Sequence, residues 1–367
     1  MRSKILILIL FFSTFSFASK HGIYLLTNKA ANGNITEIQK AIVDNAGKFN
    51  FKVLNSIAIH TPDYVKKDSK EMCGFKAHLI ILTSDEYLNT ITSYGSKYLI
   101  AGFLRIGIYE TPSGTNVIIT DPETTNRIVF NDLYENNKRD VYSQVISKTK
   151  IYKKNLINLL HSVVSGEKVE KAMEPIREAE DLAESSKDMF MMVGPLTLFN
   201  DQDQFPKIYS MENINGFEGI RELKDEIVKN LETFQPTTED KNYRNYQKAD
   251  DLKWKIISEI ESPKKDAVLL GITRPQTESV SFNISGSARE KKGDMCPGID
   301  HLTAYPIEIL LIQEGNSISV YTQKEMHRMD MYFWDAGMPA FMNHMSMPGI
   351  LDESIKRALL GKKFIEE

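Results

Sequence analysis

The sequence has 367 residues, of which 42% are hydrophobic, and its 45 lysines and arginines against 49 aspartates and glutamates leave a net charge of −4. A charge balance this close to neutral gives no electrostatic basis for binding nucleic acid or anionic lipid, so we expect no nucleic-acid partner. The length and apolar content are those of a globular chain with two domains.

Residues 1–18 have the pattern of a secretory signal. Arg2 and Lys4 precede an apolar run, and Ser16 and Ala18 supply the small residues of a cleavage site. The run is too short for a comfortable membrane span of about 20 residues, which favours cleavage over an uncleaved anchor. The sequence therefore predicts export to the periplasm, with no membrane span after signal cleavage.

Residues 19–166 have the pattern of a first α/β domain. Short apolar or alternating runs predict strands, and apolar residues spaced three or four apart predict helices. The expected strands lie at 22–26, 51–59, 78–83, 104–109 and 116–120, with a hairpin turn at 110–114. The expected helices begin near Asn34 and at 85–98, and a closing helix covers 155–164.

Residues 167–244 are expected to be a helical connecting segment. The range 167–187 is rich in charge with helical spacing, and 218–233 has the pattern of an amphipathic helix. The apolar run 189–198 is a candidate first strand of the second domain, and 237–247 is polar enough to be an exposed loop.

Residues 245–367 are expected to form a second α/β domain related to the first. A helix is predicted at 251–260, strands at 267–272, 307–312 and 318–322, and a closing helix at 355–360. The predicted hairpin at 307–322 matches that at 104–120. No helix in this half is matched to 85–98, so the two copies are predicted to be unequal.

A short string also occurs twice. Met72 to Leu79 reads MCGFKAHL, and Met295 to Leu302 reads MCPGIDHL, so each copy places a histidine five positions after a cysteine. We interpret the repeat as a mark of internal duplication. The predicted fold class is therefore α+β, with two related domains that each consist of a mainly antiparallel sheet packed by helices.

The first half resembles a known bacterial family. Its order of elements, with the phrases LRI, IYE and NVIITDPETTNRIVFND at 104–132, is similar to the family called domain of unknown function 302. The resemblance covers roughly 20–165 and more faintly 245–365. It implies small domains with an antiparallel sheet backed by helices, often dimeric, so that tandem copies would imitate the dimer in one chain. The family brings no settled activity.

The two cysteine–histidine pairs are the first candidate site, formed by Cys73 with His78 and Cys296 with His301. Residues five apart share a ligand only where the chain curls into a loop, which nearby glycine and proline permit. Three interpretations stay open. The cysteines form a disulfide between the halves, or they are buried inert thiols, or they belong to a thiolate–imidazole metal or redox site.

A cluster of methionine and histidine is the second candidate site. Thioether and imidazole groups are ligands for copper, which makes copper the cofactor to consider. The same spacing is typical of a hydrophobic core, where Met fills irregular gaps, or of a flexible surface for a protein partner. The candidate metal residues are Met326, His327, Met329, Met331, Met338, Met342, His344, Met345 and Met347.

Acidic residues next to arginine follow each predicted hairpin. Such groups at a strand end usually form solvated ion pairs of small energetic value, although paired carboxylates can do acid–base work. They are Asp121, Glu123 and Arg127 in the first half, and Glu325, Arg328 and Asp330 in the second.

No familiar catalytic string is present, and the catalytic residues are unknown. The sequence favours an exported, non-enzymatic binding or accessory protein whose ligand is a small molecule, a metal or a periplasmic protein. The alternative is a copper- or thiol-dependent redox enzyme. A further homodimer is left open.

Overall fold

The computed structural model describes most of the chain. The described residues are 20–61, 75–183, 205–214, 216–242, 249–289, 298–333, 342 and 346–361. The predicted signal at 1–18, the predicted strand at 189–198 and both cysteines lie outside these ranges.

The first half forms one antiparallel sheet. Its strands are β1 (Lys20–Ala31), β2 (Lys52–Ile59), β3 (Ala77–Thr83), β4 (Leu104–Thr111), β5 (Gly114–Thr120) and β6 (Glu167–Glu178). They lie in the order β2-β3-β4-β5-β1-β6. The helices are α1 (Ile35–Ala46), α2 (Asp85–Thr92), α3 (Pro122–Val129), α4 (Asn131–Glu135), α5 (Arg139–Val163) and α6 (Ala179–Ala183), with the 3-10 helices η1 (Gly47–Phe49) and η2 (Ser96–Ala101).

The second half forms another antiparallel sheet. Its strands are β7 (Lys207–Glu212), β8 (Lys255–Glu261), β9 (Ala267–Thr273), β10 (Ile307–Glu314) and β11 (Ser317–Thr322), in the order β7-β11-β10-β9-β8. The helices are α7 (Gly216–Thr233), α8 (Thr238–Asn242), α9 (Pro275–Arg289), α10 (Glu325–Phe333) and α12 (Met347–Leu360), with η4 (Ala249–Leu252) and η6 (Ile299–Ala304). Across the described helices, none is long and apolar enough to cross a membrane.

Local sequence explains where several elements begin. Asn34 and Glu37 exchange side-chain to backbone hydrogen bonds in a capping box that starts α1. Asp121 caps α3 by accepting a hydrogen bond from the backbone N–H of Glu123, and Pro122 occupies the first helical position. Gly114 closes the β4–β5 hairpin with a φ of +126°, a conformation that favours glycine.

The two halves share one topology. The order β2-β3-β4-β5-β1 of the first sheet corresponds strand for strand to β8-β9-β10-β11-β7 of the second. Three pairs of elements begin 203 positions apart, at Ser96 and Ile299, at Leu104 and Ile307, and at Pro122 and Glu325. The prediction of two related α+β domains is therefore confirmed.

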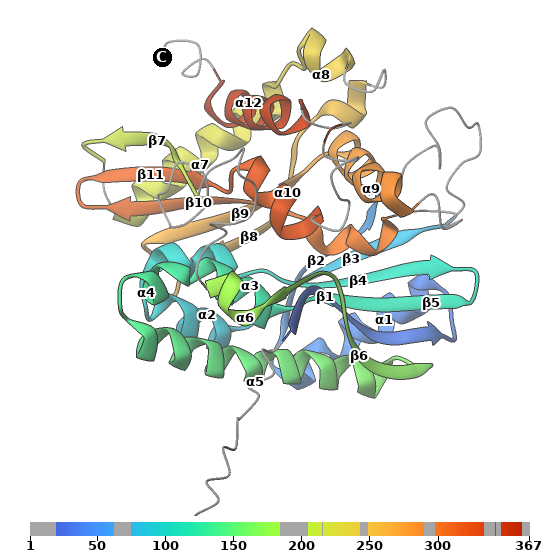
Figure 1. The fold of residues 1–367 in the computed structure, drawn as a ribbon. Coiled ribbons are helices and arrows are strands. Elements are labelled where there is room, and N and C mark those ends of the chain that lie inside the picture. The colour runs from blue at the N-terminus through green and yellow to red at the C-terminus, as the bar shows by residue number, and fades with distance from the viewer. Residues whose placement is uncertain are drawn as a thin grey trace, which may run out of the picture.

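The halves pack reciprocally, with the first sheet below the second in Figure 1 and α1 and α5 on the far side of the first sheet. The 3-10 helix η2 contacts β9 and β10, while η6 contacts β3, β4 and β5. Gly107 in β4 permits this approach, because a Cβ there would lie 2.8 Å from side-chain carbons of Leu302 and Thr303. One hydrophobic cluster runs through both halves.

Two helix predictions were wrong. The range 167–187 was expected to be helical, but its described part, 167–183, forms strand β6 and then the short helix α6, because β6 completes the hydrogen bonding of the β1 edge. Pro175 inside this range is itself unfavourable in a helix. The range 251–260, also predicted as helix, contains the end of η4 and most of strand β8, whose Ile256, Ile257 and Ile260 suit a strand.

The predicted inequality of the copies was also wrong in its detail. The second half does contain a counterpart of α2, namely α9, which follows β9 as α2 follows β3. The cysteine strings therefore occupy different places in the two copies. His78 is the second residue of β3, whereas His301 is the third residue of η6. Their similarity is not explained by the duplication that the topology establishes.

Candidate functional site

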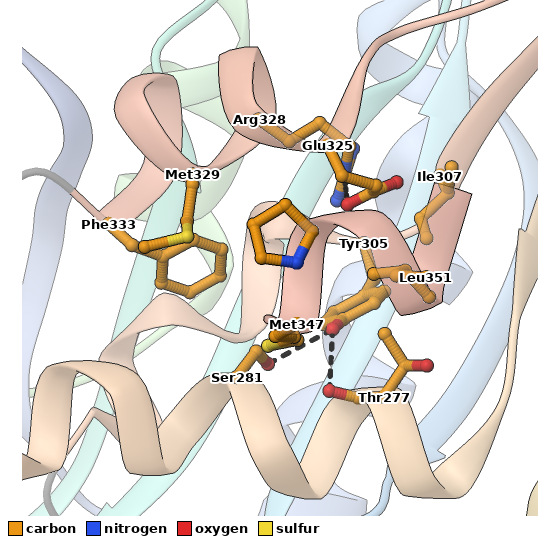
Figure 2. Close-up of a pocket in the computed structure, with 11 residues that line it drawn as sticks. Thr277, Ser281, Tyr305, Ile307, Glu325, Arg328, Met329, Phe333, Met347 and Leu351 are labelled. Carbon is orange, nitrogen blue, oxygen red and sulfur yellow. Dashed lines mark hydrogen bonds and ion pairs between the residues drawn. The ribbon is translucent and has the colours of Figure 1, made fainter. Parts of the chain in front are cut away.

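A pocket lies in the second half, between α9, α10 and α12. Its hollow measures about 330 Å³ including the part that is open to solvent, and the space that the centre of a water-sized sphere can occupy is about 20 Å³. Figure 2 shows Glu325 and Arg328 of α10 on one side, Thr277 and Ser281 of α9 on the opposite side, and Tyr305 between them. Most of the remaining wall is apolar, and its members include Met329, Phe333, Met347 and Leu351.

Glu325 is the first residue of α10 and is 6% exposed. Its Oε2 lies 3.6 Å from Nε of Arg328, and its Oε1 has no hydrogen-bond partner in the part of the chain that the structure describes. Burial raises the pKa of the carboxyl to about 7, against the opposing effect of Arg328. A buried carboxyl with an unused oxygen on a pocket wall is typical of a functional site.

Arg328 is held by oxygens on three sides. Its Nη1 donates to Oε2 of Glu308 at 3.0 Å, its Nη2 donates to the carbonyl of Ala304 at 2.7 Å, and its Nε faces Glu325. The guanidinium also lies 5.2 Å from the ring centroid of Tyr332, within the range of a cation–π contact. Arg328 is therefore fixed in position, and each of its three nitrogens faces a carboxylate or carbonyl oxygen.

The hydroxyl groups of Tyr305 and Ser281 are engaged as donors, whereas Oγ1 of Thr277 accepts from Nε of Arg274 at 2.9 Å. The Tyr305 hydroxyl lies 2.9 Å from the carbonyl of Thr277 and 3.0 Å from Oγ of Ser281, and it donates to one of them. Ser281 Oγ in turn donates to the carbonyl of Glu278 at 2.8 Å. Burial raises the pKa of Tyr305, so its hydroxyl keeps its proton.

The pocket is connected to the interface between the halves. Glu308 of β10 accepts from Arg328 and also forms a buried ion pair with Arg105 of β4, in the other half. Arg105 also donates to the Tyr332 hydroxyl and to the carbonyl of Pro306, each at 3.4 Å. A chain of buried charges therefore runs from Glu325 across the interface.

The first half fills the equivalent space with side chains. Tyr87 is the third residue of α2, where α9 has Thr277, and Asn126 is the fifth residue of α3, where α10 has Met329. The Tyr87 hydroxyl contacts Asn126 Oδ1 at 3.2 Å and donates to the carbonyl of Ala101 at 3.0 Å. A threonine in place of a buried tyrosine leaves more room for the pocket of the second half.

The predicted metal residues separate in the structure. Met329 and Met347 line the pocket, whereas His327 and Met331 meet Nε2 of Gln323, at 2.7 Å from His327 Nδ1 and 3.4 Å from Met331 Sδ. Burial lowers the pKa of His327 to about 3, which keeps the imidazole neutral. Met342 is 56% exposed. The side chain of Met326, and Met338, His344 and Met345, lie outside the described residues.

The two predicted histidines of the cysteine strings have different surroundings. His78 Nε2 lies 2.8 Å from Ser56 Oγ, and burial lowers the pKa of its imidazole. His301 is buried and stacks on Tyr24, with 4.9 Å between the ring centroids. The His301 and Phe333 rings also form a T-shaped contact, with 5.6 Å between their centroids. Because Cys73 and Cys296 lie outside the described residues, the prediction about the thiols stays a prediction.

The acidic groups of the first half are buried, which corrects the expectation of solvated ion pairs. Ligand atoms of His21, Asp121 and Glu123 lie within 4.8 Å of one another, as in a metal site. However, Lys153 Nζ already lies 2.5 Å from Asp121 and 3.5 Å from Glu123, and Arg127 lies 2.9 Å from Glu123. These cations neutralise the carboxylates, and they occupy the place that a metal ion would need.

The expectation also fails for the second half, where Glu325, Arg328 and Asp330 are buried. Burial raises the pKa of Asp330 to about 6, although the carboxylate pairs with Arg177. The sequence had therefore marked four residues of the pocket: Met329 and Met347 as candidate metal ligands, and Glu325 and Arg328 with the wrong environment. It gave no signal for Tyr305, Ser281 or Thr277, which come together only through the packing of α9 on η6.

Comparisons with known proteins assign neither a family nor a function to the chain. No protein-family model matches the sequence, and no curated protein matches it. Among solved structures, the chain is similar to one described as an uncharacterized conserved protein DUF302 from Bacillus stearothermophilus, at 8% sequence identity and a TM-score of 0.29. The similarity covers 38% of this chain and 98% of that chain. That protein has the name of the family that the first half of this sequence resembles. Membership of this chain in the family stays an expectation.

Proposed function

We propose that this protein is a non-enzymatic binding protein that takes a small, mostly apolar molecule with one hydrogen-bond donor in the Glu325 pocket. The observation that carries the proposal is Oε1 of Glu325, a buried acceptor on the pocket wall without a partner among the described residues. Leaving such a group unsatisfied costs about 1–3 kcal/mol, which a ligand donor would recover.

The engagement of the hydroxyls supports binding rather than catalysis. Ser281 donates to a main-chain carbonyl, and the Tyr305 hydroxyl keeps its proton, so neither is arranged as an activated nucleophile. The apolar wall supplies area for the body of the ligand, since small-molecule sites are mostly apolar with few polar groups.

The test is calorimetric titration with benzyl alcohol, an apolar ring with one hydroxyl. We expect saturable binding with a roughly millimolar Kd, as suits a ligand of this size. Ser281→Ile should abolish it, because Ser281 is the seventh residue of α9 and the seventh residue of α2 is the buried Ile91. Ile151→Gln on α5, a change at an exposed position, is the control. Absence of binding, or equal binding by the Ser281 variant, would refute the proposal.

Copper binding is a second candidate for the same pocket. The observation in its favour is that two of the predicted ligands, Met329 and Met347, line the cavity beside Glu325. Thioether groups are soft ligands for Cu(I). Repeating the benzyl alcohol titration with equimolar Cu(I) decides between the two, since copper held by these sulfurs would exclude the alcohol.

We also propose that the protein is exported to the periplasm and acts there. The support for export is the pattern of residues 1–18 in the sequence. Cell fractionation with mass analysis of the purified chain tests it, because cleavage after Ala18 gives a defined mass.

A further inference from the structure

We propose that the ligand of the Glu325 pocket is a protonated primary amine on a short apolar body. This names the ligand class of the function proposed above and rests on it. Glu325 presents a buried carboxyl oxygen on the pocket wall, with no partner within the described part of the chain. An ammonium group matches a buried carboxylate in both charge and hydrogen bonding.

The engaged donors of the pocket disfavour an anionic ligand. Arg328 is the guanidinium on the pocket wall, and its three nitrogens already face Glu325, Glu308 and the carbonyl of Ala304. A ligand carboxylate or phosphate would have to displace one of these buried contacts. It would also approach the Glu325 carboxylate, which carries the same charge.

The hydroxyl groups of Ser281 and Tyr305 also present hydrogen-bond acceptors to a ligand. Ser281 uses its proton on the carbonyl of Glu278, and Tyr305 uses its proton on Thr277 or Ser281. Both oxygens keep lone pairs, so Ser281, Tyr305 and Glu325 offer acceptors, whereas Thr277, which accepts from Nε of Arg274, is the hydroxyl with a proton to donate. A primary ammonium has three donors, which match the acceptors of Glu325, Ser281 and Tyr305.

The walls suit the rest of such a ligand. Phe333 and Tyr305 present aromatic rings, which attract cations, and Met329, Met347 and Leu351 provide apolar surface. The hollow of about 330 Å³ is partly open to solvent, so the ammonium group would lie inside against Glu325 and the short apolar body on the apolar walls.

The charges around Glu325 connect amine binding to pH. Arg328 on the same helix, Asp352 on α12 and Arg274 before α9 act on its carboxyl, and Glu308 on β10 shares Arg328. Burial raises the pKa of Glu325 to about 7. The carboxylate is the form that attracts an ammonium group, so affinity for the amine should be highest above neutral pH and fall as the pH decreases through 7.

The experiment compares three probes of one shape on the full chain by calorimetry: benzylamine, benzyl alcohol and toluene. At about pH 8.5 we expect benzylamine to bind at least about tenfold more tightly than benzyl alcohol, and toluene to bind most weakly. Glu325→Gln should remove the preference for the amine over the alcohol. Circular dichroism and the Tm report whether this variant is folded.

The wild-type protein provides a test that needs no variant. Between about pH 8.5 and about pH 5.5 the affinity for benzylamine should fall about 30-fold while that for benzyl alcohol changes little, because the fraction of ionised Glu325 falls by that factor. Equal binding of amine and alcohol, or a pH-independent amine affinity, overturns the amine class and leaves the proposed function standing. Failure of all three probes overturns both.

Discussion

At the scale of single residues, Glu325 shows how burial changes the meaning of a sequence pattern. An acid three positions before an arginine, at a strand end, is usually a solvated ion pair. Here α12 and η6 cover the pair, so that the carboxyl of Glu325 is raised in pKa to about 7 and keeps one oxygen unused. Sequence spacing revealed the pair, and only tertiary packing could reveal its environment.

This burial should make stability depend on pH. The folded-state pKa of Glu325 is raised from 4.5 to about 7. The stabilisation that comes from binding this proton is fully present below about pH 4.5 and is lost as the pH rises through 7. The loss is about 3 kcal/mol for a shift of this size. In Glu325→Gln this loss should be absent, so the variant should gain stability relative to the wild type between about pH 4.5 and about pH 8. Urea unfolding at the two pH values measures the difference, and a constant difference would contradict the expectation.

At the scale of elements, most strands and the hairpins were predictable because their apolar runs are buried on both faces. The nearly continuous apolar runs of β3, β4, β10 and β11 are typical of buried strands. Strand β6 was not predictable from its own residues, since its charges have helical spacing. Its conformation follows from the free edge of β1, which offers hydrogen bonds along the whole strand. Tertiary pairing overrides local propensity in such edge strands.

The contact of η6 with β4 allows a test at this scale. Gly107→Ala places a Cβ 2.8 Å from side-chain carbons of Leu302 and Thr303, which are themselves buried. Such overpacking costs about 1–3 kcal/mol. Gly349→Ala in α12 is the matched control, because its Cβ meets nothing within 4 Å and alanine favours helix. Urea denaturation should show a lower free energy of unfolding for the first variant only. Equal stability of both would show that the interface is looser than described.

At the scale of the whole molecule, the duplication was recognised from the sequence, but partly through the wrong string. The shared topology of the two sheets establishes the relation between the halves, whereas the cysteine strings fall at different places in it. What the sequence could not show is where the copies diverged. The second half has a pocket lined by Thr277 and Met329, at positions where the first half has Tyr87 and Asn126 in contact with each other.

The interface between the halves shows a second divergence. Arg105 and Glu308 are each the second residue of their strands, β4 and β10, and they pair with each other. In a symmetric dimer such a position meets its own copy, so a like charge would face a like charge. Opposite charges at equivalent positions can arise once the copies share one chain. The pair therefore favours contact between unlike halves and disfavours contact between identical ones.

A double-mutant cycle on Arg105 and Glu308 tests whether this pair couples the halves. Arg105→Met should cost about 3 kcal/mol, because Glu308 keeps Arg328, whereas Glu308→Met should cost about 5 kcal/mol, because Arg105 then lacks a carboxylate partner and Arg328 keeps only Glu325. The double variant should cost less than the sum of the two, by at least about 1.5 kcal/mol in urea unfolding. The same cycle on Lys40 and Asp44, an exposed pair in α1, should give about 0.5 kcal/mol or less. A coupling for the buried pair as small as that of the exposed one would mean that apolar packing alone holds the two halves together.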